Sequence, residues 1–432
     1  MEYSTLHMLV AGFIFAVTFV LILSERLHRT LAGFAGAVVM LVVGMMMGFY
    51  SQGEALEAID FNTMGLLFGM MVLVAILGRT GAFEYLAIAT AKATKGDPWL
   101  LTVAFGTVTT LVSMMLDNVT TIILIAPVTL LVAERLAISP IPLLMAEAIL
   151  SDVGGVATLV GDPPNMIIGS AAGFSFNDFL IHLMPIVLVA LVVTMGVLRF
   201  VFRKELAVPP QHLDALLAMD PREALNDRPM LKKILLALGV VIALFFLHDT
   251  LGLMPATVTM IGVGIAFILI RPKPEEVLKE VEWSVLVFFA ALFVVVGGVA
   301  ATGLMRLLAE QIVGVAREQP VLAIIAVLWI SALLSAIVDN IPFTVAMVPV
   351  IQALKAQGIE VDYLWWALAL GVGFGGNGTP IGSTANVVTV AMSEKTATPI
   401  TFRIWLKAGS ATAVATCIVG TILILLYYKF VG

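Results

Sequence analysis

This 432-residue sequence contains a single cysteine and few charged side chains. The single cysteine, Cys417, excludes a disulfide within the chain and a cluster of thiolate metal ligands. The five histidines show no paired spacing and no GxxxxGKS/T loop is present, so neither a zinc site nor ATP-driven transport by this chain alone is predicted. No basic cluster favours nucleic acid. We therefore expect no cofactor, no structural metal and no nucleic-acid partner, and we interpret Cys417 and the 22 methionines as packing residues.

Charged residues make up only 12% of the chain, whereas 61% is hydrophobic and the mean hydropathy is +1.09. Soluble domains carry roughly 25% charge, so this composition predicts a polytopic, all-α membrane protein. No Lys or Arg precedes the run from Met8 to Ser24 and no small-residue cleavage site follows it, so we expect a span there and not a cleaved signal. Ten runs are long enough to cross about 30 Å of hydrocarbon: 8–24, 31–49, 62–78, 142–172, 179–202, 231–248, 253–270, 284–302, 363–392 and 404–428.

Two further apolar runs, 98–134 and 320–354, contain a polar dipeptide at their centre, and we interpret them as re-entrant hairpins. With the N-terminus outside, 19 of the 23 Lys and Arg residues fall inside and 4 outside, as the positive-inside rule requires. The same count results if each hairpin is treated as two full spans. We predict a multi-pass protein of a bacterial-type inner membrane, with both termini outside and the polar segment 204–229 inside.

An internal repeat relates the two halves of the chain. Ser113 to Val128 reads SMMLDNVTTIILIAPV, and Ser335 to Val350, 222 positions later, reads SAIVDNIPFTVAMVPV. Downstream the offset is 221 and pairs Gly161 with Gly382. Each half contains five spans and a hairpin, and the odd number inverts one half relative to the other. We therefore predict two inverted-topology repeats, 1–203 and 230–432, joined by a cytoplasmic linker, 204–229, with ten spanning helices, two of them broken, and two re-entrant helical hairpins.

The spans 142–172 and 363–392 are the two that we expect to be broken. The first contains GDPPN at 161–165, and the second contains GSTAN at 382–386. Proline removes a backbone donor, and free backbone groups at membrane depth are tolerated only beside protein or a water-filled cavity. Half-helix ends of this kind bind ions and polar groups in transporters. The alternative is a kink that only serves packing.

Each hairpin centre carries an Asp-Asn pair, Asp117-Asn118 and Asp339-Asn340. A carboxylate at the bilayer centre costs at least about 2.5–3.5 kcal/mol, so two copies at equivalent places favour a functional role. The alternative is a helix cap or an interhelical hydrogen bond that seals the hairpin.

The two halves differ in their carboxylates. Glu147, Asp152 and Asp162 have no acidic counterpart in the second half. The candidates for proton coupling are Asp117, Asp152, Asp162, Asp339 and Glu147, and among them we favour Asp152 or Asp162 as the proton or sodium carrier. Glu147 can equally serve as partner of a buried polar group or lie near the membrane surface.

The motifs LDNVTT, GDPPN, VDNIPF and GGNGTPIGSTANVV together resemble the ArsB/NhaD arsenite permease and Na⁺/H⁺ antiporter family of the ion transporter superfamily, and they look closest to its P protein-like permeases. The resemblance implies a scaffold and a transport domain, a homodimer, elevator-type movement, and a substrate held between hairpin tips and breaks. By position it implies binding residues, to which the repeat adds Thr158: Asp117, Asn118, Thr120, Thr158, Gly161, Asp162, Asn165, Asp339, Asn340, Asn377, Thr379, Ser383, Thr384 and Asn386.

A secondary active transporter, not an enzyme, is the function that these features predict. Our first hypothesis is efflux of arsenite or antimonite in exchange for protons, with arsenic bound as neutral As(OH)₃ because one cysteine cannot form a three-thiolate site. The alternatives are Na⁺/H⁺ exchange, an inorganic or organic anion permease, or a channel; a separate ATPase subunit stays open as a partner. No Lys or Arg lies within a hairpin tip or a break, which argues against a dicarboxylate or citrate carrier, although helix N-termini can also hold an anion.

Overall fold

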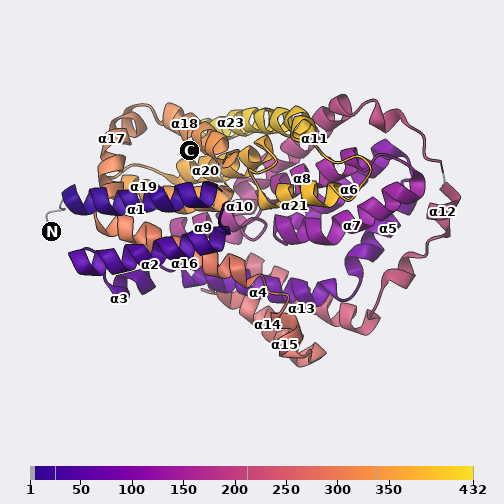
Figure 1. Cartoon of the computed structure of the whole chain (residues 1–432), viewed down its shortest axis with the longest axis horizontal. Coiled ribbons are helices and arrows are strands. Elements are labelled where there is room, and N and C mark those ends of the chain that lie inside the picture. The colour runs from indigo at the N-terminus through magenta and orange to yellow at the C-terminus, as the bar shows by residue number, and fades with distance from the viewer. Residues whose placement is uncertain (1–4, 25, 212, 338, 432) are drawn as a thin grey trace.

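The computed structural model describes residues 5–24, 26–211, 213–337 and 339–431, and within these ranges it contains helices and no strand (Figure 1). The α-helices are α1 (Thr5–Leu23), α2 (Arg29–Met47), α3 (Gln52–Glu57), α4 (Phe61–Gly78), α5 (Ala82–Ala93), α6 (Pro98–Ser113), α7 (Asn118–Leu136), α8 (Ile141–Gly155), α9 (Pro163–Ala172), α10 (Phe176–His182), α11 (Met184–Val201), α12 (Leu213–Ala218), α13 (Arg228–Leu247), α14 (Pro255–Ile270), α15 (Pro274–Leu278), α16 (Trp283–Ala301), α17 (Leu304–Glu318), α18 (Pro320–Ser335), α19 (Asn340–Ala356), α20 (Asp362–Gly375), α21 (Thr384–Ser393), α22 (Phe402–Trp405) and α23 (Ala411–Val431). The prediction of an all-α polytopic protein is confirmed.

Eight helices in the described ranges are long and apolar enough to cross a membrane: α1, α2, α4, α7, α11, α13, α16 and the helical stretch from α22 through α23. Seven of them coincide with predicted spans, whereas α7 is the longer arm of a predicted hairpin. The other three predicted spans are α14, which has 16 residues, and the two broken helices. The helices that are long enough to span a membrane are therefore not quite the same as the predicted spans, and the count of ten spans stays a prediction.

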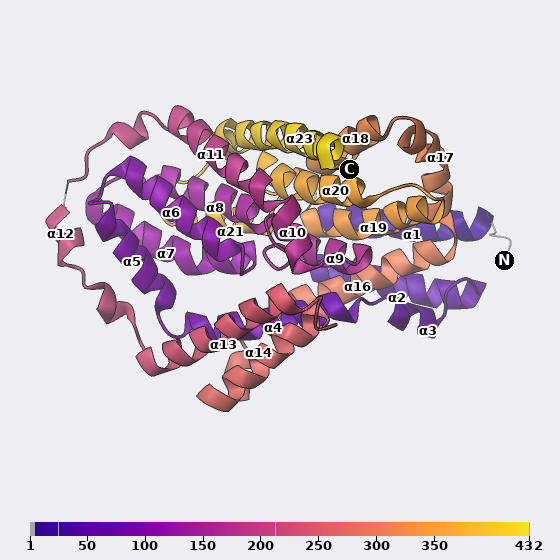
Figure 2. The same ribbon diagram turned by 180° about the vertical axis from the view of Figure 1, so that it is seen from behind.

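Both predicted hairpins form two antiparallel helices around the Asp-Asn pair. The helix α6 ends at Ser113 and α7 begins at Asn118, whereas α18 ends at Ser335 and α19 begins at Asn340. Figures 1 and 2 show α6 and α7 toward the end of the molecule that carries α12, and α18 and α19 toward the end that carries the N-terminus. The two hairpins thus approach the middle from opposite ends. This arrangement is the one expected of inverted repeats, and the inversion itself stays a prediction.

The predicted breaks lie where proline and glycine interrupt the apolar runs. The helix α8 ends at Gly155 and α9 begins at Pro163, whereas α20 ends at Gly375 and α21 begins at Thr384. Each hairpin lies against its broken helix, α6 on α8 and α18 on α20. The approach is close because glycine faces it: a Cβ atom on Gly154 would lie 2.7 Å from the carbonyl oxygen of Thr110.

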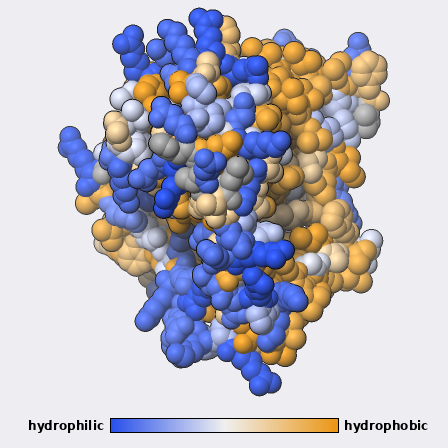
Figure 3. All heavy atoms as spheres, turned by 90° about the vertical axis from the view of Figure 1, so that its right-hand side faces the viewer, coloured by the Kyte–Doolittle hydropathy of each residue, from blue (hydrophilic) through white to orange (hydrophobic). Residues whose placement is uncertain are grey.

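Two helical pairs flank the central unit that the two hairpins and the two broken helices form. The pair α1–α2 packs on α16, and the pair α13–α14 packs on α4. The described residues of the segment 204–229 pack on α5 and α7, and the Gln211 amide donates to the Leu136 carbonyl at 3.0 Å. Hydrophilic side chains gather on the end of the molecule seen in Figure 3, which in Figure 1 carries α5 and α12. A water-facing surface at this end agrees with the polar composition of the predicted linker.

Candidate functional site

The two breaks are each braced by a buried asparagine. The Asn165 amide nitrogen Nδ2 donates to the carbonyl oxygens of Gly155, Val156 and Thr158 at 3.1, 3.1 and 2.9 Å. The equivalent Asn386 Nδ2 donates to Gly376 at 3.1 Å and to Thr379 at 3.4 Å. These carbonyls are left without helical partners where α8 and α20 end, and an unpaired buried carbonyl is costly. Both predicted asparagines therefore join the two pieces of their own broken helix.

Threonine and glycine fasten each break to a hairpin tip. The Thr158 hydroxyl donates to the Met114 carbonyl and accepts from the Gly161 amide at 3.0 Å. In the second half the Thr379 hydroxyl donates to the Ala336 carbonyl. A Cβ atom on Gly161 would lie 2.7 Å from the Ser113 carbonyl oxygen, so the backbone can approach the hairpin only without a side chain. The predicted Thr158, Gly161 and Thr379 thus position the site through backbone contacts.

Two carboxyl groups of the first broken helix lie at the centre of the site. Asp152 Oδ1 accepts from Asn118 Nδ2 at 2.6 Å and from Ser383 Oγ at 2.9 Å. Asp162 Oδ2 accepts from Asn340 Nδ2 at 3.3 Å. All five side chains are at most 4% exposed. The structure therefore brings the tips of both hairpins and both breaks to one place, as the sequence predicts.

One oxygen of each of these carboxyl groups has no partner. Asp152 Oδ2 and Asp162 Oδ1 are buried and make no hydrogen bond to any described residue. Buried polar atoms are nearly always paired, and an exception calls for a proton, an ion or a water molecule. No group of three His, Cys, Asp or Glu side chains suited to a metal ion occurs in the described parts of the chain. The arrangement can hold a proton or a monovalent cation between carboxyl, amide and hydroxyl oxygens.

Asp117 is a helix cap. It is the N-cap of α7, where Oδ1 accepts from the Thr120 amide at 2.9 Å and Oδ2 accepts from the Thr120 hydroxyl at 2.5 Å. Of the two interpretations of the Asp-Asn pairs, a functional role or a helix cap, the geometry of Asp117 is that of a helix cap. The predicted Thr120 is its partner.

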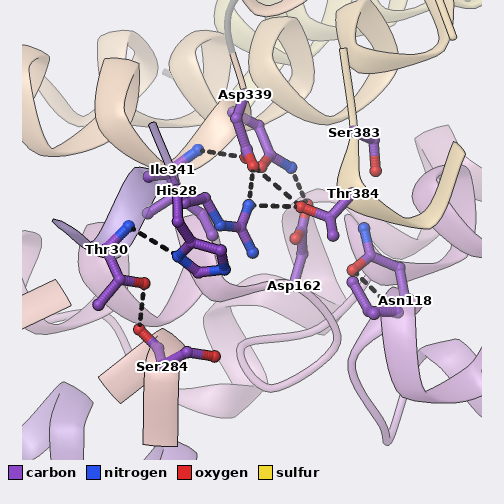
Figure 4. Close-up of polar contacts among 12 residues, drawn as sticks. His28, Thr30, Asn118, Asp162, Ser284, Asp339, Ile341, Ser383 and Thr384 are labelled. Carbon is purple, nitrogen blue, oxygen red and sulfur yellow. Dashed lines mark hydrogen bonds and ion pairs between the residues drawn. The ribbon is translucent and has the colours of Figure 1, made fainter. Parts of the chain in front are cut away.

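Asp339 occupies the equivalent N-cap of α19 but cannot be satisfied in the same way. The residue three positions on is Pro342, which has neither an amide hydrogen nor a hydroxyl group. Asp339 Oδ1 accepts from the Ile341 amide at 3.3 Å, and Oδ2 accepts from the Thr384 hydroxyl at 2.9 Å and from Arg29 Nη1 (Figure 4).

Arg29 is the site residue that the sequence reasoning missed. It begins α2, and its Nη1 also donates to the Thr384 hydroxyl at 2.7 Å. No Lys or Arg lies within a hairpin tip or a break, as the sequence analysis states, but a basic side chain from another helix reaches the second tip. The physical reason is tertiary: the first residue of α2 lies beside Asp339 of the second hairpin tip, although the two are 310 residues apart in the chain. The local signal was Pro342, which leaves Asp339 with only the Ile341 amide as a partner on its own helix.

Two predicted residues lie outside the central cluster. Glu147 Oε1 accepts from the Thr129 hydroxyl of α7, and Oε2 has no partner among the described residues. Asn377 Nδ2 donates to the Ile149 carbonyl at 3.2 Å, and the backbone carbonyl oxygen of Asn377 accepts from Trp405 Nε1 at 3.1 Å. Glu147 is thus a partner of a buried polar group, and Asn377 joins the second break to α8.

Hairpins that meet broken helices inside a bundle of apolar helices define a multi-pass membrane transporter. Residues 19–371 match the CitMHS family, described as citrate transporter, and the chain belongs to this family. It is 42% identical to a 46 kDa membrane protein of Mycobacterium leprae over 96% of this chain and 97% of that protein. An uncharacterized transporter of Mycobacterium tuberculosis is 40% identical over 97% of this chain and 98% of its own length.

The human P protein is 32% identical over 98% of this chain and 60% of its own length, which confirms the resemblance to P protein-like permeases. The fold is that of the Alcanivorax borkumensis YdaH transporter, with a TM-score of 0.62 at 14% identity and 98% coverage of both chains. The matched family, the Mycobacterium tuberculosis relative and the YdaH protein are named as transporters and not as enzymes, as predicted. The finer assignment to the ArsB/NhaD branch stays a prediction.

Proposed function

We propose that the protein is a secondary active transporter that couples the movement of a small solute to a proton or Na⁺ bound between Asp152 and Asp162. The observation that carries this proposal is the pair of buried, unpartnered oxygens on these two carboxyl groups. Each carboxyl group is held by an asparagine from a different hairpin. A cation that neutralises them removes the cost of charge at membrane depth, so its binding changes the free energy of the whole site.

The solute that we favour is a small organic anion of the citrate class. The family carries this description, and Arg29 supplies a positive charge at the second hairpin tip. A second candidate is arsenite or antimonite in exchange for protons, because the oxygen-rich lining accepts hydrogen bonds from a neutral hydroxide such as As(OH)₃. Na⁺/H⁺ exchange without another solute would use the same two carboxyl groups.

Movement of the central unit against the flanking helices supplies alternating access in this proposal. The central unit consists of the two hairpins and the two broken helices, and the flanking scaffold consists of α1, α2, α4, α13, α14 and α16. The repeats 1–203 and 230–432 each contribute to both parts. We also propose a homodimer in a bacterial-type inner membrane, with the termini outside and the linker inside.

Uptake into inverted, energised membrane vesicles tests the coupling site. Citrate, arsenite and Na⁺ are offered separately to the wild type, to Asp152→Asn and Asp162→Asn, and to the control Asp97→Asn. Asp97 is the N-cap of α6 in the same half of the chain, and its carboxylate accepts from the backbone amide of Leu100. The control therefore makes the same Asp-to-Asn change outside the cluster. We expect gradient-driven transport of one solute in the wild type and the control, and none in the two cluster variants. Full gradient-driven transport in both cluster variants would refute the proposal.

A further inference from the structure

The two hairpin tips hold equivalent carboxylates in different ways. Asp117 receives both an amide and a hydroxyl hydrogen from Thr120, one helical turn along its own helix. Asp339 has Pro342 at that position, so its stronger partners come from elsewhere in the chain. A carboxylate fixed by its own helix stays in place, whereas one fixed by a side chain of another helix can be exchanged for a different anion.

The exchangeable ion pair faces a cavity of about 340 Å³. Arg29 and Asp339 line this cavity together with Thr384 and His28, and apolar side chains complete its wall. The two charged side chains are 26% and 16% exposed, so a solute can reach both. The volume lies within the range of about 300–1,000 Å³ that is typical of small-molecule sites.

Arg29 is oriented for a second ligand. Its guanidinium carbon lies 5.5 Å from the centre of the Phe288 ring. The next residue, Thr30, anchors the start of α2, because its hydroxyl donates to the Ser284 carbonyl at 2.9 Å (Figure 4). Both hydrogen bonds of the Arg29 guanidinium group, to Asp339 and to Thr384, come from Nη1, while Nε and Nη2 donate to no described residue. A guanidinium group can bind a carboxylate end-on through two parallel hydrogen bonds from Nη1 and Nη2, and binding of this kind requires Asp339 to leave Nη1.

We propose that Arg29 anchors a carboxylate group of the transported anion, a small di- or tricarboxylate, and that Asp339 occupies Arg29 when the solute is absent. This inference rests on the proposed transporter function and names its substrate contact. The arriving carboxylate replaces Asp339 on the guanidinium group. The released Asp339 carboxylate keeps the Thr384 hydroxyl and the Ile341 amide but has lost its counter-charge, and a proton or Na⁺ then neutralises it next to Asn340, which bonds Asp162. Anion binding and cation binding are thereby linked at one hairpin tip.

Equilibrium binding of citrate to the purified full-length protein tests the anchor. The variants are Arg29→Gln, which removes the charge, and Arg29→Lys, which keeps the charge without the planar fork. Arg26→Gln is the control, because it removes a charge three residues before Arg29, ahead of the start of α2. We expect Arg29→Gln to weaken citrate binding by roughly 10- to 100-fold, the range that loss of a hydrogen bond between charged groups gives. Arg29→Lys loses less, and Arg26→Gln binds citrate like the wild type.

Arsenite, which is neutral, is the second probe in the same variants. Its binding or transport should not change in Arg29→Gln, since no carboxylate is present to lose its anchor. The anchor is refuted if the wild type binds no citrate, or if folded Arg29→Gln binds citrate as tightly as the wild type. If Arg29→Gln does not fold, an unchanged citrate affinity in Arg29→Lys refutes it instead. Gradient-driven arsenite transport without citrate binding would overturn the anchor alone, whereas Arg29-dependent citrate binding without gradient-driven transport would overturn the proposed function alone.

Discussion

Replacing Pro342 by threonine should increase the affinity for citrate, although this residue does not contact the bound anion. The substitution copies the first hairpin, where Thr120 donates its amide hydrogen to Asp117 at 2.9 Å and its hydroxyl hydrogen at 2.5 Å. In Pro342→Thr, Asp339 gains the same two donors on its own helix. It then no longer depends on Arg29, and the guanidinium group becomes available.

The size of the effect follows from the competing hydrogen bonds. A hydrogen bond to a charged group contributes about 1.5–3 kcal/mol net, while a partly exposed ion pair contributes about 0–1 kcal/mol. One of the two new bonds is therefore enough to move Asp339 away from Arg29. The gain in citrate affinity cannot exceed the free energy of the ion pair that is removed, so we expect citrate to bind up to roughly fivefold tighter, since every 1.4 kcal/mol changes affinity tenfold.

The assay is citrate binding to the purified protein, with the reverse change in the other half as the reference. Thr120→Pro removes both donors from Asp117 and weakens the α7 cap, which costs about 0.5–2 kcal/mol of stability. It should leave citrate affinity unchanged because Arg29 does not contact Asp117 in the described structure. Unchanged or weaker citrate binding in folded Pro342→Thr would show that Asp339 does not compete for Arg29.

Three further predictions concern stability, and thermal unfolding in detergent checks each of them. Gly161→Ala places a Cβ atom 2.7 Å from the Ser113 carbonyl oxygen and should cost about 1–3 kcal/mol; an unchanged melting temperature would mean that the break can relax. Asn165→Ala leaves buried carbonyls such as that of Gly155 unpaired and should cost about 1–3 kcal/mol, whereas Asn165→Asp, which keeps the shape, tests whether the donated hydrogens matter. Burial raises the pKa of Glu282, at the start of α16, from 4.5 to about 6. Its protonated form therefore adds stability below pH 4.5 that is lost as the pH rises to 6, at most about 2 kcal/mol, and this step should be absent in Glu282→Gln.

The helical elements and the breaks were predictable from local sequence because hydropathy, proline and glycine act locally. The ends of α8 and α9 follow directly from the glycines and prolines around Asp162. The repeat singled out the two asparagines that donate to the central carboxyl groups, although Asn118 bonds Asp152 of its own half and Asn340 bonds Asp162 of the other half. The contact of Arg29 with Asp339 was not predictable, since it depends on where the start of α2 lies relative to α19 in space. Helix lengths such as the 16 residues of α14 also depend on packing, and so the number of spans does not follow from hydropathy alone.

The braces at the two breaks limit how the site can move. Asn165 and Asn386 each bond carbonyls on the far side of the break, so the two pieces of a broken helix form one stiff joint. Bending at a break would rupture several buried hydrogen bonds at once. A change in access is therefore cheaper when the joint, its hairpin and the cation travel together as one body, and the geometry around the cation is then the same on both sides of the membrane.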